Sequence, residues 1–467
     1  MRASSRFYFW SLVILALLIC TFTAMQGAVP QTRGGSDSAI LYDAGWRAYC
    51  GMRPHADFYS SLGPFMYLYA GTGFWLFGVN VHVIAYMNAI SFCLLTGLIW
   101  YLLRDRLSPF WLFWLAMLIA VCFIAPWSLR LPKHLSSYAT LYNRQGSGLL
   151  MLFCSLLFCP AVKIPEFRWK LTSIVLGCLL PMMFFLKISL FIAAAPAFIV
   201  AYLIEVRKWL YHLYFAVAAA MVSVLFLAYI RFDVLGMMSD LSITAKAKSI
   251  YMNELFPYFV STGVDMLLPI LTCLIILFAG TTAVTRDPQS KLHFGWRGFM
   301  EECTVCILLL GVFCFTVFTN AIWGYASDYP GFIMLAIVMC ARFQHRLDKD
   351  KDVDEYKRPL AFQLTSGLAS VFSLFYIMTI TYYTVNYINP VAQPVAFEAP
   401  ALKGLVFDKA FSPHSMVYNT NDGIRLLQKN HVDNKPFMVM EFASYVHLAM
   451  GARPYRGTTF IDYGINI

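Results

Sequence analysis

Charged residues are scarce in this chain of 467 residues. Asp, Glu, Lys and Arg together make up 13%, well below the roughly 25% that is usual in soluble domains. Hydrophobic residues make up 60% and aromatic residues 17%. This composition excludes an ordinary cytosolic enzyme. The net charge of +10 does not indicate nucleic acid, because the basic residues lie mostly in short clusters between apolar stretches, as in membrane proteins.

The sequence also lacks the pattern of a disulfide or zinc framework. Nearly all of its twelve cysteines lie inside apolar stretches, where cysteine behaves as a small hydrophobic residue. Cys303 and Cys306 form a CxxC motif, but the second pair that would complete a zinc site is absent. No internal repeat of the kind that marks many transporters is present.

Apolar stretches long enough to cross a membrane recur along the chain, and short charged stretches separate them. A stretch at 65–78 is too short and too interrupted by glycine to cross, so we expect it to lie at the membrane surface. The first apolar run could be a cleaved signal peptide, but its length and the lack of a clean A-x-A site favour a retained helix. We expect about eleven spans, near residues 7–25, 81–103, 110–127, 147–162, 171–205 (a hairpin of two that turns near Lys187), 210–230, 266–284, 303–321, a stretch ending near 340, and 360–388.

The charge distribution predicts the orientation. If the first residues are cytoplasmic, every inner connection is basic, as the positive-inside bias requires. We therefore expect a multi-pass protein of a bacterial cytoplasmic (inner) membrane, with its N-terminus inside. The expected fold class is an all-α polytopic membrane protein with a small C-terminal extracytoplasmic α/β segment.

Two regions follow from this layout. Residues 1–388 form the transmembrane domain, with an outer loop at 28–80, and residues 389–467 form the C-terminal segment. In that segment we expect a helix near 422–429 and a strand over 436–442. The chain stops on a strand-like pattern, so the segment could be incomplete, and some seventy residues would make only a marginal core on their own.

Polar residues concentrate in the first outer loop, over residues 36–64. A carboxylate just outside the first span, such as Asp37, could act as a general base or hold a metal ion against a phosphate. It could equally cap the helix that begins there, because Ser36 and Asp37 are both good capping residues. Asp57 could be a second carboxylate of the site or the ion-pair partner of Arg53, and His55 could be a metal ligand or a surface histidine.

The stretch from Asp37 to Pro64 resembles the first outer loop of GT-C-type integral-membrane glycosyltransferases. These include the lipid A aminoarabinose transferases and the protein O-mannosyltransferases, which commonly show G-x-x-P-Y-x-D-F. Here the segment is GMRPHADF at 51–58, with His55 in place of the usual Tyr. The resemblance implies a bundle of spans, a catalytic loop carboxylate at Asp37 and a second at Asp57. Ser38 stands where several relatives have Glu, so a paired acid and its metal are not implied.

Relatives of this type use a sugar carried on a polyprenyl phosphate, and its anionic phosphate requires cations at the outer surface. Lys187 is the most unusual candidate, because a Lys inside an apolar run is costly unless it lies at a hairpin tip and snorkels to the interface. Tyr42 and Asp328 could contact the acceptor, although Asp328 could simply form a turn. The candidate phosphate-binding residues are Arg53, Arg130, Lys133, Arg144 and Lys187.

The sequence thus predicts an inverting membrane glycosyltransferase of cell-envelope glycan biosynthesis. It would move a hexosyl or pentosyl group to a glycan, lipid or protein acceptor, with no nucleic acid involved. Whether Asp37, Asp57 or His55 binds a divalent metal is open at this point. The alternatives are a transporter or flippase of a lipid-linked substrate, and a GT-C-like protein with only a binding role. Charged central helices and a repeated half would favour the transporter, and neither is present in the sequence.

Overall fold

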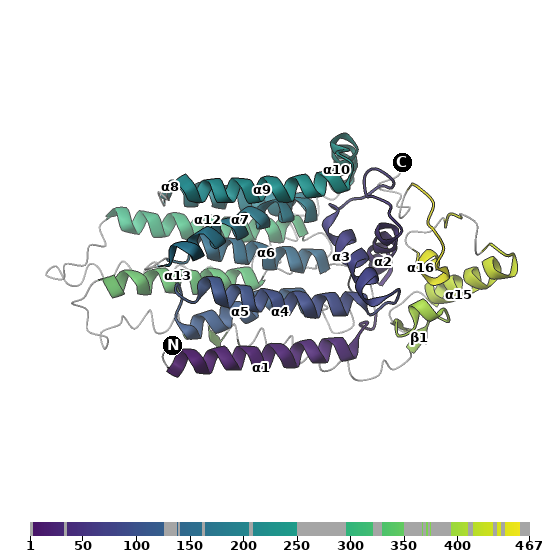
Figure 1. Ribbon diagram of the computed structural model, residues 1–467, viewed down its shortest axis with the longest axis horizontal. Helices are drawn as coiled ribbons and strands as arrows, with labels where there is room; N and C mark the ends of the chain where they lie inside the picture. The colour runs from purple at the N-terminus through teal and green to yellow at the C-terminus, as the bar shows by residue number, and fades with distance from the viewer. Residues whose placement is uncertain are drawn as a thin grey trace.

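The computed structural model describes residues 3–31, 35–125, 138, 141–160, 164–204, 209–249, 296–320, 329–349, 367, 370–371, 374, 394–409, 414–432, 437–439 and 444–457. Within them, long helices lie side by side in a bundle (Figure 1). These are α1 (Ala3–Gln26), α4 (Val83–Leu103), α5 (Pro109–Ile124), α6 (Leu141–Phe158), α7 (Glu166–Leu186), α8 (Ile188–Ile204), α9 (Trp209–Tyr229), α12 (Trp296–Asn320) and α13 (Tyr329–Lys349).

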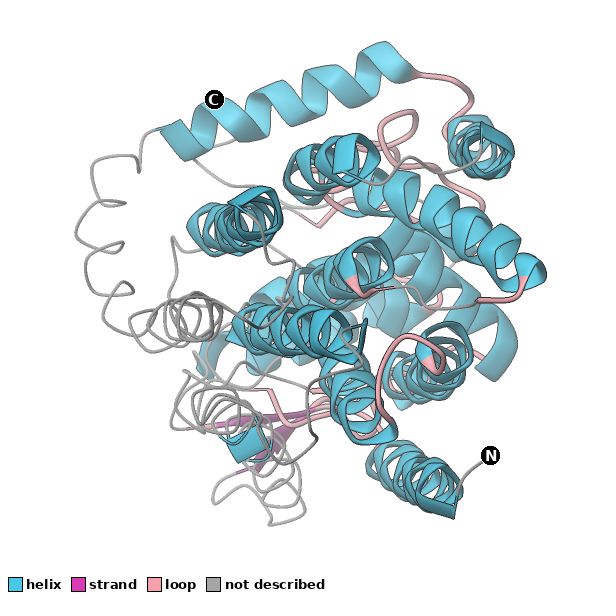
Figure 2. Cartoon of the chain, turned by 90° about the vertical axis from the view of Figure 1, so that its left-hand side faces the viewer, coloured by secondary structure: helices cyan, strands magenta, loops and turns pink. Residues whose placement is uncertain are grey.

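Several of these helices are built to face lipid. Helices α1, α4, α7 and α9 are long and apolar enough to cross a membrane, and α5, α8 and part of α13 are shorter apolar helices. Only 17% of the apolar window of α1 and 6% of that of α9 are buried in the protein, and α1 lies at the edge of the bundle in Figure 2. Exposed leucines and methionines on such helices need an apolar surrounding. The chain is therefore a multi-pass membrane protein.

One end of the bundle carries the remaining elements, and we call it the capped end (Figure 1). It holds the short helices α2 (Gly35–Tyr49) and α3 (Phe65–Phe77), and α10 (Val234–Ser249) follows α9 there. The C-terminal segment covers α2 and α3 from outside. Its described elements are β1 (Pro394–Ala396), the 3-10 helix η4 (Pro400–Leu402), β2 (Val406–Asp408), α15 (His414–Lys429) and α16 (Val446–Met450).

Most of the expected spans agree with helices, and the hairpin near Lys187 is confirmed: α7 ends at Leu186 and α8 begins at Ile188. Helix α6 begins at Leu141, so the residues LYNRQG, expected in an outer loop, are helical. Helix α10 likewise occupies part of the expected outer loop 231–265, and α13 continues to Lys349 beyond the expected end near 340. The expected span at 266–284 and nearly all of that at 360–388 lie outside the described residues.

Helices α7 and α9 run in the same direction and touch along their lengths. Near their starts, Trp169 stacks on Tyr211 with ring centroids 5.8 Å apart, and near their ends Phe185 stacks on Phe226 at 4.7 Å. Between these pairs, a Cβ on Gly177 would overlap the backbone of α9. Small residues let helices approach closely in membranes, where packing rather than the hydrophobic effect holds them together.

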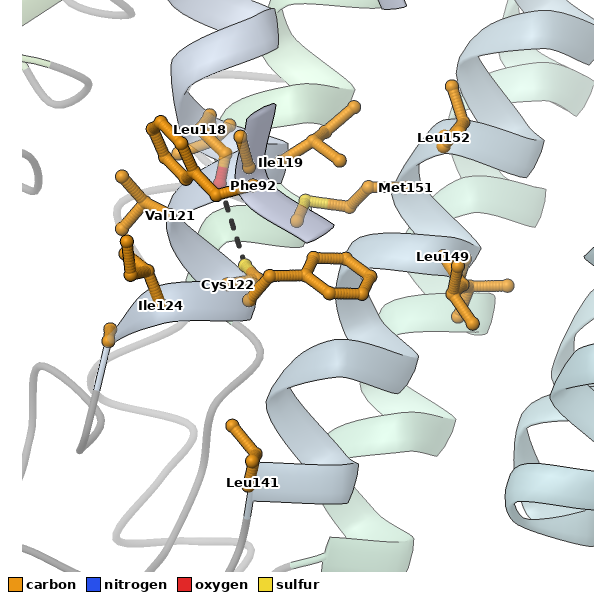
Figure 3. Close-up of a cluster of buried hydrophobic side chains, with 14 of the residues drawn as sticks. Phe92, Leu118, Ile119, Val121, Cys122, Ile124, Leu141, Leu149, Met151 and Leu152 are labelled. Atoms are coloured by element: carbon orange, nitrogen blue, oxygen red, sulfur yellow. Dashed lines mark hydrogen bonds between the residues drawn. The ribbon is translucent and has the colours of Figure 1, made fainter. Parts of the chain in front are cut away.

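The centre of the bundle is a dense apolar core between α4, α5 and α6 (Figure 3). Phe92, Leu118 and Met151, one from each helix, are fully buried there. The Cys122 thiol donates to the Leu118 carbonyl oxygen one turn earlier at 3.5 Å. This interior packing fixes the starting turns of α4 and α6, which lie at the capped end.

The opposite end of the bundle is held by buried arginines. The Arg106 guanidinium donates to the Leu156 carbonyl oxygen at 2.8 Å, and that of Arg342 donates to the Phe158 carbonyl oxygen at 3.0 Å. Arg342 also makes two hydrogen bonds with Glu302, at 2.6 and 3.1 Å. The last carbonyl groups of a helix have no partner within it, so these guanidinium groups stabilise the end of α6.

The C-terminal segment shares its core with the rest of the capped end. Strands β1 and β2 pair antiparallel, with Val395 opposite Phe407. Gln31 extends this sheet, because its N–H donates to the Val406 oxygen at 2.7 Å. The Tyr445 ring lies against Phe397, Phe407 and the Tyr42 ring of α2. This shared core stabilises the C-terminal segment, which would have only a marginal core on its own.

The predicted secondary structure of the segment is only partly right. The helix expected near 422–429 is the second half of α15 (His414–Lys429). The strand expected over 436–442 is wrong for residues 437–439, which belong to no strand, and its other residues lie outside the described ones.

Candidate functional site

The structure describes the side chains of some candidate site residues and not of others. Asp37 is the third residue of α2 (Gly35–Tyr49), which places it in the first helical turn; its side chain is outside the description. Arg130, Lys133 and Asp328 lie outside the described residues altogether. The other candidates have described side chains: Tyr42, Arg53, His55, Asp57, Arg144 and Lys187.

Asp57 closes a turn of the first outer loop. Its carboxylate accepts the Arg53 backbone N–H at 3.0 Å, and its own N–H donates to the Arg53 carbonyl oxygen at 2.8 Å. Its second carboxylate oxygen lies 3.4 Å from the guanidinium of Arg456 in the C-terminal segment. Asp57 is thus bound to the Arg53 backbone, and its ion pair is with Arg456. The turn orients the Asp57 carboxylate and leaves the Arg53 side chain half-buried.

His55 has an unusual backbone and a buried ring. Its φ is 67°, in the left-handed region that costs about 1 kcal/mol or more for a residue with a Cβ. Its fully buried ring places Nδ1 2.8 Å from an Asp240 carboxylate oxygen. The Ser60 backbone N–H donates to the same oxygen at 3.0 Å. Asp240 lies on α10, so this pair fixes the loop against a helix far away in the chain.

The His55–Asp240 pair also sets the tautomer of the ring. An ionised carboxylate can only accept, so Nδ1 carries the proton and Nε2 carries the lone pair when the ring is neutral. Nε2 is buried and has no hydrogen-bond partner among the residues with described side chains. His55 therefore presents an unmatched hydrogen-bond acceptor inside the capped end.

Two cationic residues gather at the start of α6. The Lys187 ammonium group donates to the Asn143 side-chain oxygen at 3.0 Å and lies 5.7 Å from the centre of the Tyr142 ring. Arg144, the residue of α6 that follows Asn143, is 3% exposed. The N-terminus of a helix carries a partial positive charge and free N–H groups. Together these features make a region suited to an anion.

The first outer loop packs directly beside this cationic region. At Gly63 a Cβ would overlap the carbonyl oxygen of Phe185, two residues before Lys187. The hydroxyl groups of Ser60 and Tyr67 are hydrogen-bonded at 2.7 Å, and burial raises the pKa of Tyr67 well above its usual value. The end of the first outer loop, at Gly63, therefore lies against the end of α7, and Lys187 follows that end and bonds Asn143 of α6.

Three polar side chains from different helices hydrogen-bond one another beside the start of α6. The Tyr69 hydroxyl and the Gln145 side-chain amide both donate to the Asn88 side-chain oxygen, at 2.8 and 3.1 Å. These bonds join α3, α4 and α6. Together with the bond from Lys187 to Asn143, they give two polar side chains of LYNRQG partners from other elements while the stretch is helical.

Tyr42 belongs to the core of the capped end. It is fully buried, and its hydroxyl donates to the Val81 carbonyl oxygen at 2.7 Å. Burial raises the pKa of Tyr42 well above its ordinary value, so the hydroxyl stays protonated and remains a donor. This position gives Tyr42 a structural role, joining α2 to the turn before α4.

Sequence reasoning passed over three residues of the capped end. Asp43 and Arg47 form a buried ion pair at 2.8 Å within α2, and their i, i+4 spacing is the signal that could have found it. His447 of α16 has a ring nitrogen 3.5 Å from Asp43. No local pattern around His447 marks it, because its partner lies at the other end of the chain.

Among the side chains described, no group of three or more His, Cys, Asp and Glu could hold a metal ion. The Asp57 carboxylate and the His55 ring face different partners, Arg456 and Asp240. These two residues therefore do not form a shared metal site.

No protein-family model and no curated protein matches the sequence. Among solved structures, ArnT from Cupriavidus metallidurans bound to undecaprenyl phosphate is 13% identical with a TM-score of 0.44, over 91% of this chain and 72% of that one. The same protein in the apo state is 12% identical with a TM-score of 0.47, over 97% and 86% of the two chains. The Archaeoglobus fulgidus oligosaccharyltransferase, in complex with zinc and sulfate, is 13% identical with a TM-score of 0.42, over 95% and 62%.

Proposed function

We propose that the protein is a membrane glycosyltransferase that works at the capped end of the bundle. It moves a sugar from a polyprenyl-phosphate donor to an acceptor on the extracytoplasmic face. The observation that supports this proposal is the packing of Gly63, in the first outer loop after GMRPHADF, against Phe185 of α7, two residues before Lys187. In this proposal, that contact brings the first outer loop close to the cations that bind a lipid phosphate.

Lys187, Arg144 and the first turn of α6 bind the donor phosphate in this proposal. The hydrogen bond from Lys187 to Asn143 holds the ammonium group at the α6 N-terminus. Hydrogen bonds between charged partners are about twice as strong as neutral ones. The lipid chain of the donor lies along the apolar helices. Arg53, half-buried in the first outer loop, adds a further cation in this proposal.

Asp37 acts as the general base in this proposal. Its carboxylate takes the proton of an acceptor hydroxyl while that oxygen attacks the anomeric carbon of the sugar. The bond from the anomeric carbon to the phosphate oxygen breaks, and its electron pair stays with the departing polyprenyl phosphate. Lys187 and Arg144 stabilise the negative charge of that leaving group. A single displacement of this kind inverts the anomeric configuration. Asp57 orients the turn that carries Arg53.

The experiment supplies the purified protein in lipid nanodiscs with radiolabelled polyprenyl-phosphate hexoses and pentoses, and with cell-envelope extract as acceptor. The proposal predicts that label leaves the polyprenyl phosphate and enters acceptor material. It also predicts that Lys187→Met weakens polyprenyl-phosphate binding by about tenfold or more, the scale of one charge-assisted hydrogen bond. Lys170→Met, at the opposite end of the bundle, is the matched control. Movement of donor lipid across liposomes without any transfer would refute the enzyme and favour a flippase.

A further inference from the structure

Two cysteine thiols that the proposed transfer chemistry does not use meet where α1 packs against α4. The Sγ atoms of Cys20 and Cys93 lie 3.1 Å apart, although 73 positions of sequence separate the two residues. The Cys20 thiol also donates to the Ala89 carbonyl oxygen of α4 at 3.2 Å. Non-bonded carbon atoms rest about 3.5–4.0 Å apart, and sulfur atoms are larger. The two sulfur atoms are therefore in unusually close contact.

Contacts on both sides of the pair fix the register of α1 against α4. Toward one end of the two helices, the Phe9 ring lies 5.5 Å from the Trp100 ring. At the other end, the Ala28 N–H donates to Nδ1 of His82, the residue just before α4, at 2.9 Å. The helices therefore run antiparallel, and their packing holds the two thiols opposite each other.

A disulfide bond is within reach of this arrangement. The sulfur atoms of a disulfide are about 2.0 Å apart, so the Sγ atoms of Cys20 and Cys93 need to approach each other by only about 1 Å. Helix α1 can supply part of this movement, because only 17% of its apolar window is buried in the protein. Few contacts therefore oppose a small shift of α1.

The pair lies within the membrane and faces lipid. Cys93 is exposed and Cys20 is partly exposed, beside the exposed side chains of Leu17 and Leu94. Helix α1 ends at Gln26, so Cys20 lies roughly 9 Å before that end at the rise of an α-helix. Thiol–disulfide exchange requires direct access to the sulfur atom. A water-soluble disulfide therefore cannot reach the pair, whereas an oxidant dissolved in the bilayer can.

We propose that Cys20 and Cys93 are a redox pair, which a lipid-soluble quinone oxidises to a disulfide between α1 and α4. Both S–H bonds break as the S–S bond forms, and the two electrons and two protons pass to the quinone, which becomes a quinol. A dithiol reductant reverses the oxidation in the denatured chain. The disulfide fastens α1, the helix that leads into the first outer loop, to the rest of the bundle. This proposal does not depend on the proposed sugar transfer.

The test identifies the linked peptides and counts the free thiols. Reduced full-length protein in lipid nanodiscs is incubated without oxygen with decylubiquinone, denatured in excess N-ethylmaleimide and digested for mass spectrometry. We expect peptides joined through Cys20 and Cys93 in most of the protein, and two fewer alkylated cysteines than the twelve of the sequence. The joined peptides should be absent without quinone and should separate on treatment with dithiothreitol.

A matched pair of variants controls for the link. Cys93→Ala should abolish the joined peptides and leave every remaining cysteine alkylated. Cys122→Ala should leave the link unchanged, because the Cys122 thiol is buried and bonds within its own helix. Quinone treatment should also raise the unfolding temperature of the wild type and of Cys122→Ala, and should not raise that of Cys93→Ala.

Three outcomes would overturn the proposal. Complete alkylation of Cys20 and Cys93 after quinone treatment would mean that they are only two hydrogen-bonded thiols. Joining of Cys20 to several other cysteines in equal amounts would contradict the fixed register of α1 and α4. Linkage by water-soluble diamide but not by the quinone would exclude oxidation from the bilayer. The measurements on the wild type decide even if Cys93→Ala does not fold.

Discussion

Asp240 is the residue through which α10 holds the first outer loop. Its one carboxylate oxygen accepts from both His55 Nδ1 and the Ser60 N–H. The bond to the His55 ring spans 185 positions of sequence. The G-x-x-P-Y-x-D-F pattern that this loop resembles has a Tyr at the position of His55. The polar character of the loop was therefore predictable, but this partner was not, because nothing local to Asp240 marks it.

We predict that Asp240→Ala destabilises the protein. The substitution leaves two buried donors without an acceptor, at a cost of about 1–3 kcal/mol for each such group. Thermal unfolding in detergent should show a clear loss, whereas Ser239→Ala, on the exposed side of the same turn, should change little. Equal unfolding temperatures for the two variants would contradict the structural role of the pair.

Cys50, at the end of α2, gives a pH-dependent prediction. Burial raises the pKa of its thiol above the ordinary value of 9.0, and the Asp43 carboxylate also raises it, against opposing effects of Arg453 and Arg47. Only the thiolate reacts with alkylating reagents. Alkylation at pH 7.5, followed by peptide mass spectrometry, should be slower than for free cysteine and should accelerate as the pH rises past 9. Asp43→Asn should speed it; a rate equal to that of free cysteine would refute the raised pKa.

At the scale of elements, most helices could be predicted because the lipid bilayer fixes the length of an apolar span. The predicted helix bounds differ from the structure where polar side chains hydrogen-bond residues that are distant in the sequence. LYNRQG continues α6 because Asn143 bonds Lys187 and Gln145 bonds Asn88. Helix α10 differs from the expected loop because Asp240 hydrogen-bonds the first outer loop, which is distant in the sequence. A sequence read alone cannot supply those partners.

Gly63 tests the contact between the first outer loop and α7. A methyl group there would overlap the Phe185 backbone, so Gly63→Ala should force the loop away from Lys187. We expect a stability loss of about 1–3 kcal/mol, as for overpacking elsewhere, and weaker polyprenyl-phosphate binding. Gly97→Ala is the matched control, because no atom lies within 4 Å of a Cβ there and alanine favours a helix. A stable Gly63→Ala protein with unchanged lipid binding would contradict the contact.

At the scale of the whole molecule, the first outer loop and the C-terminal segment are joined into one cap. Trp46 of α2 donates to the Ala452 carbonyl oxygen at 2.9 Å, and Gly457 exchanges backbone hydrogen bonds with Asp57 and Tyr59 at 3.0 and 3.2 Å. Most of the described helices were predictable from hydropathy. The joining of the two ends was not, because backbone pairing between distant segments leaves no local sequence signal.

The distribution of basic residues predicts that this cap lies outside the cytoplasm. A membrane-impermeant maleimide applied to intact spheroplasts should label Arg456→Cys, whose side chain is 74% exposed, above the background of the parent protein. Arg104→Cys, an exposed residue directly after the end of α4 that lies away from the cap, should react only after the membrane is permeabilised. The reverse pattern would invert the orientation and place the proposed reaction in the cytoplasm.

The central claim is that the capped end transfers a sugar with Asp37 as the base. The most direct measurement is a single-turnover transfer assay of wild type and Asp37→Asn, with donor binding followed in the same samples. We predict that Asp37→Asn binds the donor normally and transfers the sugar about 10²- to 10⁴-fold more slowly, the usual contribution of a general base. Equal transfer rates in the two proteins would remove Asp37 from the chemistry and contradict the account.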